Sequence, residues 1–266
     1  RISSDDPDEL MPPAESHKEP FTDEEISLIR SWIEAGAVYD PHWAFVKPSR
    51  PSIESQIEHG ANKVSTAIDY FVDQQHQSQG LTRAAPATPT RWLRRASLDL
   101  LGLPPTVEEL RSFEQEVYDK GSIAYNRAVD RLLASPHYGE RMALTWLDIS
   151  RYADTNGFQH DAYRMNWPWR DWVIRAFNEN IPYDQFTLEQ LAGDLLDDPS
   201  TDQLVATAFN RNHMINAEGG AIREENLAKT ALDRIETTGT TWLGLTVACC
   251  QCHDHKFDPI KQREYY

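Results

Sequence analysis

Three cysteines lie close together near the end of this 266-residue sequence, in the segment Cys249-Cys250-Gln251-Cys252-His253. Two residues separate Cys249 from Cys252 and His253 follows directly, which is the attachment pattern of a c-type haem. The spacing has a chemical reason, because two thiols so placed can reach the two vinyl groups on one edge of a porphyrin. The histidine then lies where it can bind the iron as the proximal ligand. The segment therefore predicts haem c, attached through Cys249 and Cys252, with His253 on the iron.

Two other interpretations of this segment stay open. Cys249, Cys252, His253 and His255 have the chemistry of four zinc ligands, although structural zinc sites usually take their ligand pairs from separated segments. The cysteines are also compatible with an inert thiol pair or a disulfide. All three cysteines of the chain lie in this segment, so there is no disulfide framework, and Cys250 stays unpaired if haem takes the other two.

The ligand on the opposite side of the iron has two candidates upstream. Met214 would give His/Met ligation and His213 would give bis-His ligation, and without either the iron would keep an open position. His255 is only two residues from His253, so we expect it to bind a carboxylate or a backbone group instead. Arg211 and Arg234 are candidates to pair with the haem propionates.

A second methionine with possible iron chemistry is Met11, which two prolines follow. Each proline fixes its own φ and restricts the residue before it, so this loop is rigid enough to hold a thioether toward an iron. A helix should follow, because Thr22 and Glu25 have the spacing of a capping box and Gly36 can end the helix.

Helical periodicity accounts for most of the remaining chain. Its apolar spacing, caps and prolines predict helices near 68–72, over 90–101, after Thr106, from Pro136, around 169–177 and 188–195, and over 224–235 with a possible break at Gly239. Trp242 is then the nearest aromatic candidate for a wall beside the cysteines. Strand-like alternation is scarce. The expected fold is mainly α, an irregular helical bundle with long loops and little or no β-sheet.

Charge and hydropathy limit the partners. The chain has 26 Lys and Arg against 42 Asp and Glu, a net charge of −16, which repels nucleic-acid phosphates and anionic lipids. No stretch approaches the ~20 apolar residues that a membrane span needs. We therefore expect neither nucleic acid nor a membrane as a partner.

Several long stretches carry a family resemblance. They are Met11–Pro13 with His42–Phe45, Arg94–Thr106, Leu132–Arg141, Trp146–Asp148, Arg151–Gly157, Trp169–Ile174 and Thr237–Ile260. The first resembles the C-terminal end of the planctomycete cytochrome C domain. The others resemble the domain that follows it in that family, which is catalogued as a domain of unknown function.

The resemblance implies a domain division and a location. Residues 1–47 would be the end of a cytochrome-c-like domain, 48–66 a linker, and 67–266 a helical domain with its own haem motif. The chain would then be a fragment, and Met11 would be the axial ligand of a haem whose cysteines lie outside it. Its partners would be the upstream cytochrome c domain and a downstream domain of the same protein. Covalent haem and the resemblance both indicate a periplasmic or otherwise exported protein.

Three functions are compatible with these residues. The leading one is a c-type cytochrome module that transfers electrons through its haem iron. The second is a haem-dependent oxidoreductase acting on an organic substrate, for example a carbohydrate, with Asp154, His160 or Asp161 in its pocket. The third is a structural or binding module whose cysteines hold zinc or nothing. Asp154, Asn156, Gly157 and Asp161 depart from the order of a calcium loop and predict a turn rich in Asx residues instead.

Overall fold

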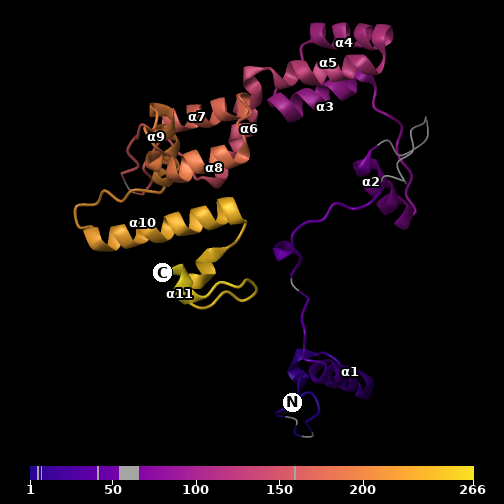
Figure 1. Cartoon of the computed structure of the whole chain (residues 1–266), viewed down its shortest axis with the longest axis vertical. Helices are drawn as coiled ribbons and strands as arrows, with labels where there is room; N and C mark the ends of the chain where they lie inside the picture. Colours follow the sequence, from indigo (N-terminus) through magenta and orange to yellow (C-terminus); the bar gives the residue numbers. More distant parts are fainter. Residues whose placement is uncertain (5, 7, 41, 54–65, 159) are drawn as a thin grey trace. The chain divides into compact units, whose positions relative to one another are not determined.

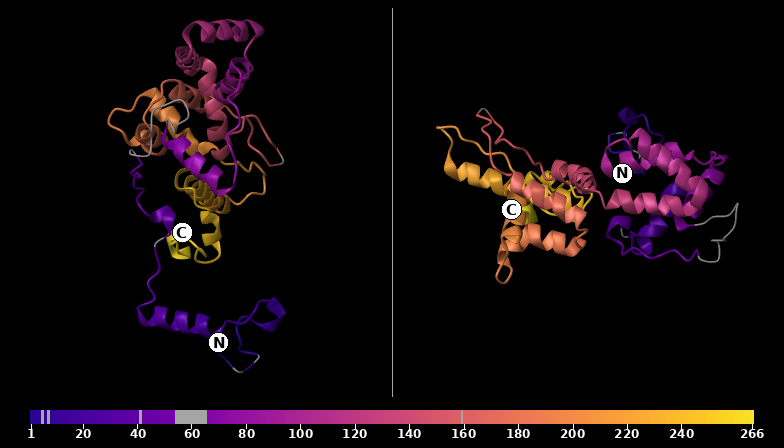
Figure 2. Two further views of the ribbon diagram at one scale, coloured as in Figure 1. Left: turned by 90° about the vertical axis from the view of Figure 1, so that its right-hand side faces the viewer. Right: turned by 90° about the horizontal axis from the view of Figure 1, so that it is seen from above.

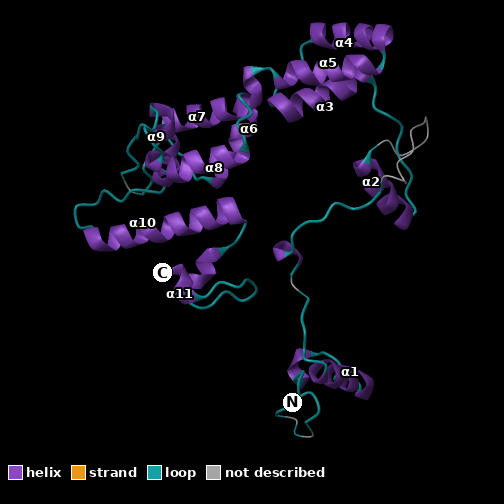
Figure 3. Ribbon diagram, viewed as in Figure 1, coloured by secondary structure: helices purple, strands orange, loops and turns teal. Residues whose placement is uncertain are grey.

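The computed structural model describes the chain except residues 5, 7, 41, 54–65 and 159, and it divides into two compact units, Arg1–Ala84 and Ala85–Tyr266 (Figure 1). The regular secondary structure of the described residues is helical. Their single β contact is an isolated bridge between Thr155 and Tyr163 (Figure 3). The prediction of a mainly α fold with little or no sheet is confirmed. No helix in the described ranges is long and apolar enough to cross a lipid bilayer.

The first unit contains η1 (Ala14–Ser16), α1 (Asp23–Glu34), η2 (Trp43–Phe45) and α2 (Ala67–Ser78). The capping box predicted for α1 is present, because the Glu25 N–H donates to Thr22 Oγ1 at 3.2 Å and the Thr22 N–H donates to Glu25 Oε2 at 2.8 Å. None of the described residues in this unit is buried. Residues 54–65 of the predicted linker lie outside the described residues.

The second unit begins with a group of three helices, α3 (Pro89–Leu101), α4 (Val107–Lys120) and α5 (Ser122–Leu133). Its core consists of Leu93, Phe113, Ala124, Ala128 and Leu132. Local sequence determines where α3 ends and where α4 begins. Gly102 ends α3 at a φ of 70°, and Thr106 and Glu109 form the predicted capping box of α4.

A larger core lies among α6 (Pro136–Ile149), α7 (Trp167–Asn178), α8 (Tyr183–Ala192), η4 (Gly193–Leu195), α9 (Thr201–Ala206) and η5 (Thr207–Arg211). Trp169, Trp172, Val173, Phe186 and Phe209 are buried there. Helix α6 packs against both α3 and α7, and so joins the two groups (Figures 1 and 2).

The last part of the chain contains α10 (Arg223–Thr238), the single π-helical turn η6 (Gly239–Leu243), the 3₁₀ turn η7 (Val247–Gln251) and α11 (Gln262–Tyr265). The possible break at Gly239 is a change of helix type, because the α-helix ends at Thr238 and Gly239 keeps helical angles at the start of the π-helical turn. Gly239 is also a point of close approach, because a Cβ added there would lie 2.8 Å from Val247 Cγ2. The end of α10 and the start of the cysteine-bearing turn are thus packed directly together.

The crossing of α6 and α7 depends on Gly139. A Cβ at this position would lie 2.4 Å from the Ile174 carbonyl oxygen, and the Gly139 N–H donates to Asn178 Oδ1 at 2.8 Å. The lack of a side chain lets the two helix backbones approach closely.

We predict that Gly139→Ala lowers the free energy of unfolding by about 1–3 kcal/mol, because the added methyl must displace the backbone of α7. Urea unfolding followed by tryptophan fluorescence measures this. Gly219→Ala is the matched control, since no atom lies within 4 Å of a Cβ added there. Equal stability of the two variants would contradict the proposed close approach.

The loop after α6 holds a tyrosine with a perturbed ionisation. The Tyr152 hydroxyl donates to Asp154 Oδ1 at 2.6 Å. Burial and this hydrogen bond raise the pKa of Tyr152 to about 12. Because the folded pKa lies above the unfolded value of ~10, the stability from this group is complete below pH ~10 and is lost as pH rises toward the folded pKa.

We therefore predict that Tyr152→Phe makes unfolding less sensitive to alkaline pH. The difference in free energy of unfolding between the parent and variant proteins should be constant below pH ~10 and shrink above it. Denaturant unfolding of both proteins across that range measures the difference. A difference that does not change with pH would show that Tyr152 ionises as it does in the unfolded chain.

Candidate functional site

The three cysteines differ sharply in exposure. Cys249 and Cys250 lie in η7, and Cys252 follows at its end. Cys249 and Cys252 are exposed, whereas Cys250 is 0% exposed and its Sγ lies 3.6 Å from the Ile260 carbonyl oxygen. Cys250 packs in a small cluster with Val247 and Tyr265, against which Leu232, Leu245 and Ile260 lie. The buried cysteine thus anchors the turn that presents the other two.

His253 is exposed beside these thiols, and its tautomer follows from its hydrogen bond. Its Nδ1 lies 2.7 Å from the Asp254 carbonyl oxygen. A carbonyl only accepts, so Nδ1 carries the proton and Nε2 carries the lone pair. Metal-binding histidines commonly have this arrangement, since the backbone hydrogen bond orients the ring and makes Nε2 more basic.

His255, unlike His253, is buried, and its side chain is only 6% exposed. Its Nδ1 accepts from the N–H of Asp258 at 2.8 Å and of Phe257 at 3.3 Å, and the Asp258 carboxylate lies 3.2 Å away. The expectation that His255 binds a carboxylate or backbone group is confirmed. The ring holds the turn that follows the motif.

The zinc interpretation needs three or four of these side chains around one point. Among the described residues, which include Cys249, Cys252, His253 and His255, no group of three His, Cys, Asp or Glu side chains is arranged to hold a metal ion. Haem attachment needs only two accessible thiols and one imidazole with a free Nε2. Cys249, Cys252 and His253 have the residue types, order and exposure that the predicted haem attachment requires, and their role stays a prediction.

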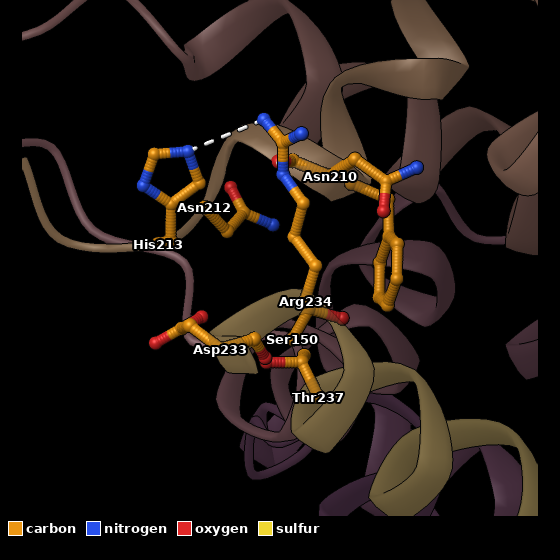
Figure 4. Close-up of a pocket in the computed structure, with 8 residues that line it drawn as sticks. Ser150, Asn210, Asn212, His213, Asp233, Arg234 and Thr237 are labelled. Carbon is orange, nitrogen blue, oxygen red and sulfur yellow. Dashed lines mark hydrogen bonds between the residues drawn. The ribbon is translucent and has the colours of Figure 1, made fainter. Parts of the chain in front are cut away.

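The two candidates for the distal ligand lie in the segment before α10. His213 Nδ1 is 3.0 Å from the Met214 carbonyl oxygen, and Nε2 is 3.4 Å from Arg234 Nη2 (Figure 4). Met214 is 57% exposed and lies over Gly157, where an added Cβ would be 3.0 Å from its Sδ. Three cavities that His213 lines in the described part of the chain contain no residue of 247–257. Distal ligation by either residue stays a prediction.

Arg164 is a site residue that sequence patterns did not single out. Its guanidinium donates to the carbonyl oxygens of His213 at 2.7 Å, Arg211 at 3.1 Å and Asn212 at 3.1 Å, and Nε donates to Ala153 at 3.3 Å. Burial lowers the pKa of the Arg164 guanidinium. One arginine thus gathers the backbone of the segment that carries Arg211 and His213.

The proposed acid–base residues are held by separate partners. Asp154 accepts from Tyr152, whereas Asp161 Oδ1 accepts from the Gly157 N–H at 2.9 Å. Hydrogen bonds from Thr155 and Gly157 lower the pKa of the Asp161 carboxyl. These contacts support the prediction of an Asx-rich turn. His160 is exposed.

Trp242, the candidate aromatic wall, and Met11, the candidate axial ligand, have other surroundings. The Trp242 ring lies 4.9 Å from Trp146 and 5.8 Å from Phe209, so it belongs to the larger core of the second unit. Met11 belongs to the first unit, where it is 40% exposed and its N–H donates to the Arg1 carbonyl oxygen at 3.2 Å. Its role as an axial ligand of another haem stays a prediction.

Comparison with known proteins gives one result. No curated protein and no solved structure matches this chain. A family model does match, and it covers all of the second unit, residues 67–84 of the first unit and all three cysteines. The chain belongs to the PSCyt2 family, described as a protein of unknown function (DUF1549), whose domain is associated with planctomycete cytochrome c proteins and matches residues 67–266.

Proposed function

We propose that the helical domain is a c-type cytochrome module of an exported redox protein. Haem would be attached through thioether bonds to Cys249 and Cys252, with His253 as the proximal iron ligand. One observation carries the proposal. Of three cysteines within four residues, the two with the required spacing are exposed and the third is buried.

Burial selects the thiols that can react. A thiol at 0% exposure inside an apolar cluster is shielded from a porphyrin, so Cys250 acts as a small core residue. Cys249 and Cys252 are accessible and would leave no competing cysteine beside them. The hydrogen bond from His253 Nδ1 to the Asp254 carbonyl leaves the lone pair on Nε2, where it would bind the iron.

Apolar side chains close to the motif in sequence support a flat apolar ligand. Leu243 is 66% exposed before the cysteines and Phe257 is 83% exposed after them. Exposed apolar surface of this kind is removed from water when a porphyrin face covers it. Both residues lie in segments that join the cysteine turn.

When bound, haem supplies one-electron Fe(III)/Fe(II) chemistry. The residues of this chain would fix one porphyrin edge through two thiols and orient the proximal imidazole through the Asp254 carbonyl. The upstream cytochrome c domain and a downstream domain of the same protein would be the electron partners. Export follows in this proposal from covalent attachment, which takes place outside the cytoplasm.

We predict that the protein, exported through a cytochrome c maturation system, shows a c-type pyridine haemochrome spectrum that survives acid–acetone extraction. Cys249→Ala/Cys252→Ala should abolish the covalent haem, because both thioether bonds are lost. Cys250→Ala is the matched control and should keep the spectrum, since the buried thiol forms no bond to haem.

Two outcomes would reject the proposal. The first is a colourless exported protein with stoichiometric zinc that is lost in the Cys249→Ala/Cys252→Ala variant. The second is a colourless protein with three free thiols. Cytoplasmic expression does not test the proposal, because haem is not attached there.

A further inference from the structure

A hollow of about 410 Å³ lies between the loop after α6, the segment before α10 and α10 itself. Three arginines line it, Arg164, Arg211 and Arg234, together with His213, Asn166 and two apolar side chains. No carboxylate is among its described lining residues. In a chain with 42 acidic and 26 basic residues, three guanidinium groups around one hollow are a strong local concentration of positive charge.

The carboxylates of Asp233 and Asp154 accept hydrogen bonds from residues that do not line the hollow. Asp233, next to Arg234 in sequence, receives hydrogen bonds from Arg151 Nη1 at 2.8 Å and Nη2 at 2.7 Å. Asp154 accepts from the Tyr152 hydroxyl, but it keeps its negative charge and attracts Arg164. Among the described residues, Arg211 and Arg234 form no ion pair with a carboxylate.

The three guanidinium groups differ in how many of their N–H groups already have a hydrogen-bond acceptor. Arg164 donates to four backbone carbonyl oxygens. Arg234 uses Nε on the Asn210 carbonyl at 2.9 Å and turns Nη2 toward His213 (Figure 4). In the described part of the chain, the Arg211 side chain has no hydrogen bond or ion pair.

A second observation lies beside the hollow. Asn212 is 3% exposed and its Oδ1 accepts from Asn166, but its Nδ2 is buried without a partner among the described residues. Asn212 lines a separate cavity of about 10 Å³ together with Arg234 and His213, and it is not among the residues that line the hollow (Figure 4). That cavity is too small for an oxyanion, so the two cavities share Arg234 and His213 but not the Asn212 donor.

We propose that this hollow binds an oxyanion, that is, a carboxylate, sulfate or phosphate group. Arg211 and Arg234 would bind it directly, because guanidinium groups donate two parallel hydrogen bonds to such groups. Arg164 would position the 211–213 backbone and add positive potential. The site does not depend on the haem proposal, since none of its residues belongs to the cysteine segment.

The test is a calorimetric titration of inorganic sulfate into the whole chain, with chloride adjusted to keep the ionic strength constant. Sulfate should bind, and Arg211→Gln should weaken its affinity about tenfold, as expected for the loss of one charge-assisted hydrogen-bonding group. Arg211→Lys should recover part of the affinity. Arg127→Gln removes the same charge from α5, where Arg127 pairs with Glu116, and should leave the affinity unchanged.

Structural effects are separated by a melting curve without sulfate. Arg211→Gln should melt like the parent protein, because the replaced side chain has no described partner. No sulfate binding beyond the chloride control would overturn the proposal. Equal weakening in the Arg211→Gln and Arg127→Gln variants would overturn it too, because the effect would then reflect net charge alone.

Two sources of the oxyanion are distinguished by repeating the titration on haem-loaded protein and on Cys249→Ala/Cys252→Ala. Equal binding to both identifies a free ligand or substrate group as the natural occupant. Binding only to the variant without haem identifies the haem propionates as the occupant. If the protein carries no haem in any form, sulfate binding to it still decides the oxyanion proposal.

Discussion

The ion pair between Arg151 and Asp233 fixes α10 against the rest of the second unit. Arg151 follows the end of α6 with a φ of 58°, a left-handed conformation that turns its side chain out of the helical path. Its guanidinium then donates to both carboxylate oxygens of Asp233 and to the Asp233 carbonyl at 2.9 Å. The pair is partly exposed, so it contributes little to the free energy of unfolding. Its contribution is to define the position of α10 through three hydrogen bonds.

Both chemical regions of the domain depend on where α10 lies. One face of the helix carries Arg234 toward the hollow, where Nε binds the Asn210 carbonyl. Leu232 packs against the cluster of Val247, Cys250 and Tyr265 that supports the cysteine turn. The close contact of Gly239 with Val247 leaves little freedom between the helix and that turn. A shift of α10 would therefore move Arg234 and the thiols together.

Local signals in the sequence predicted the elements that local interactions form. The capping boxes at Thr22 and Thr106 and the glycine end of α3 each depend on a few neighbouring residues. The cysteine motif was visible for the same reason. The place of Trp242 could not be predicted, because Trp146 and Phe209 are distant in sequence. The burial of Cys250 depends on how the turn folds onto Val247 and Tyr265, which the spacing of the motif does not encode. Arg164 looked like any polar loop residue until the fold brought carbonyls from 211–213 around it.

The net charge of −16 and a binding site for anions are physically compatible. At physiological ionic strength the field of an exposed charge is screened over ~8 Å, so distant carboxylates contribute little at the hollow. The potential there is set by the nearest groups, which are three arginines whose neighbours are mostly backbone carbonyls. Carbonyl oxygens solvate a guanidinium without cancelling its charge. This arrangement keeps positive charge inside an acidic protein, whereas pairing with carboxylates would have removed it.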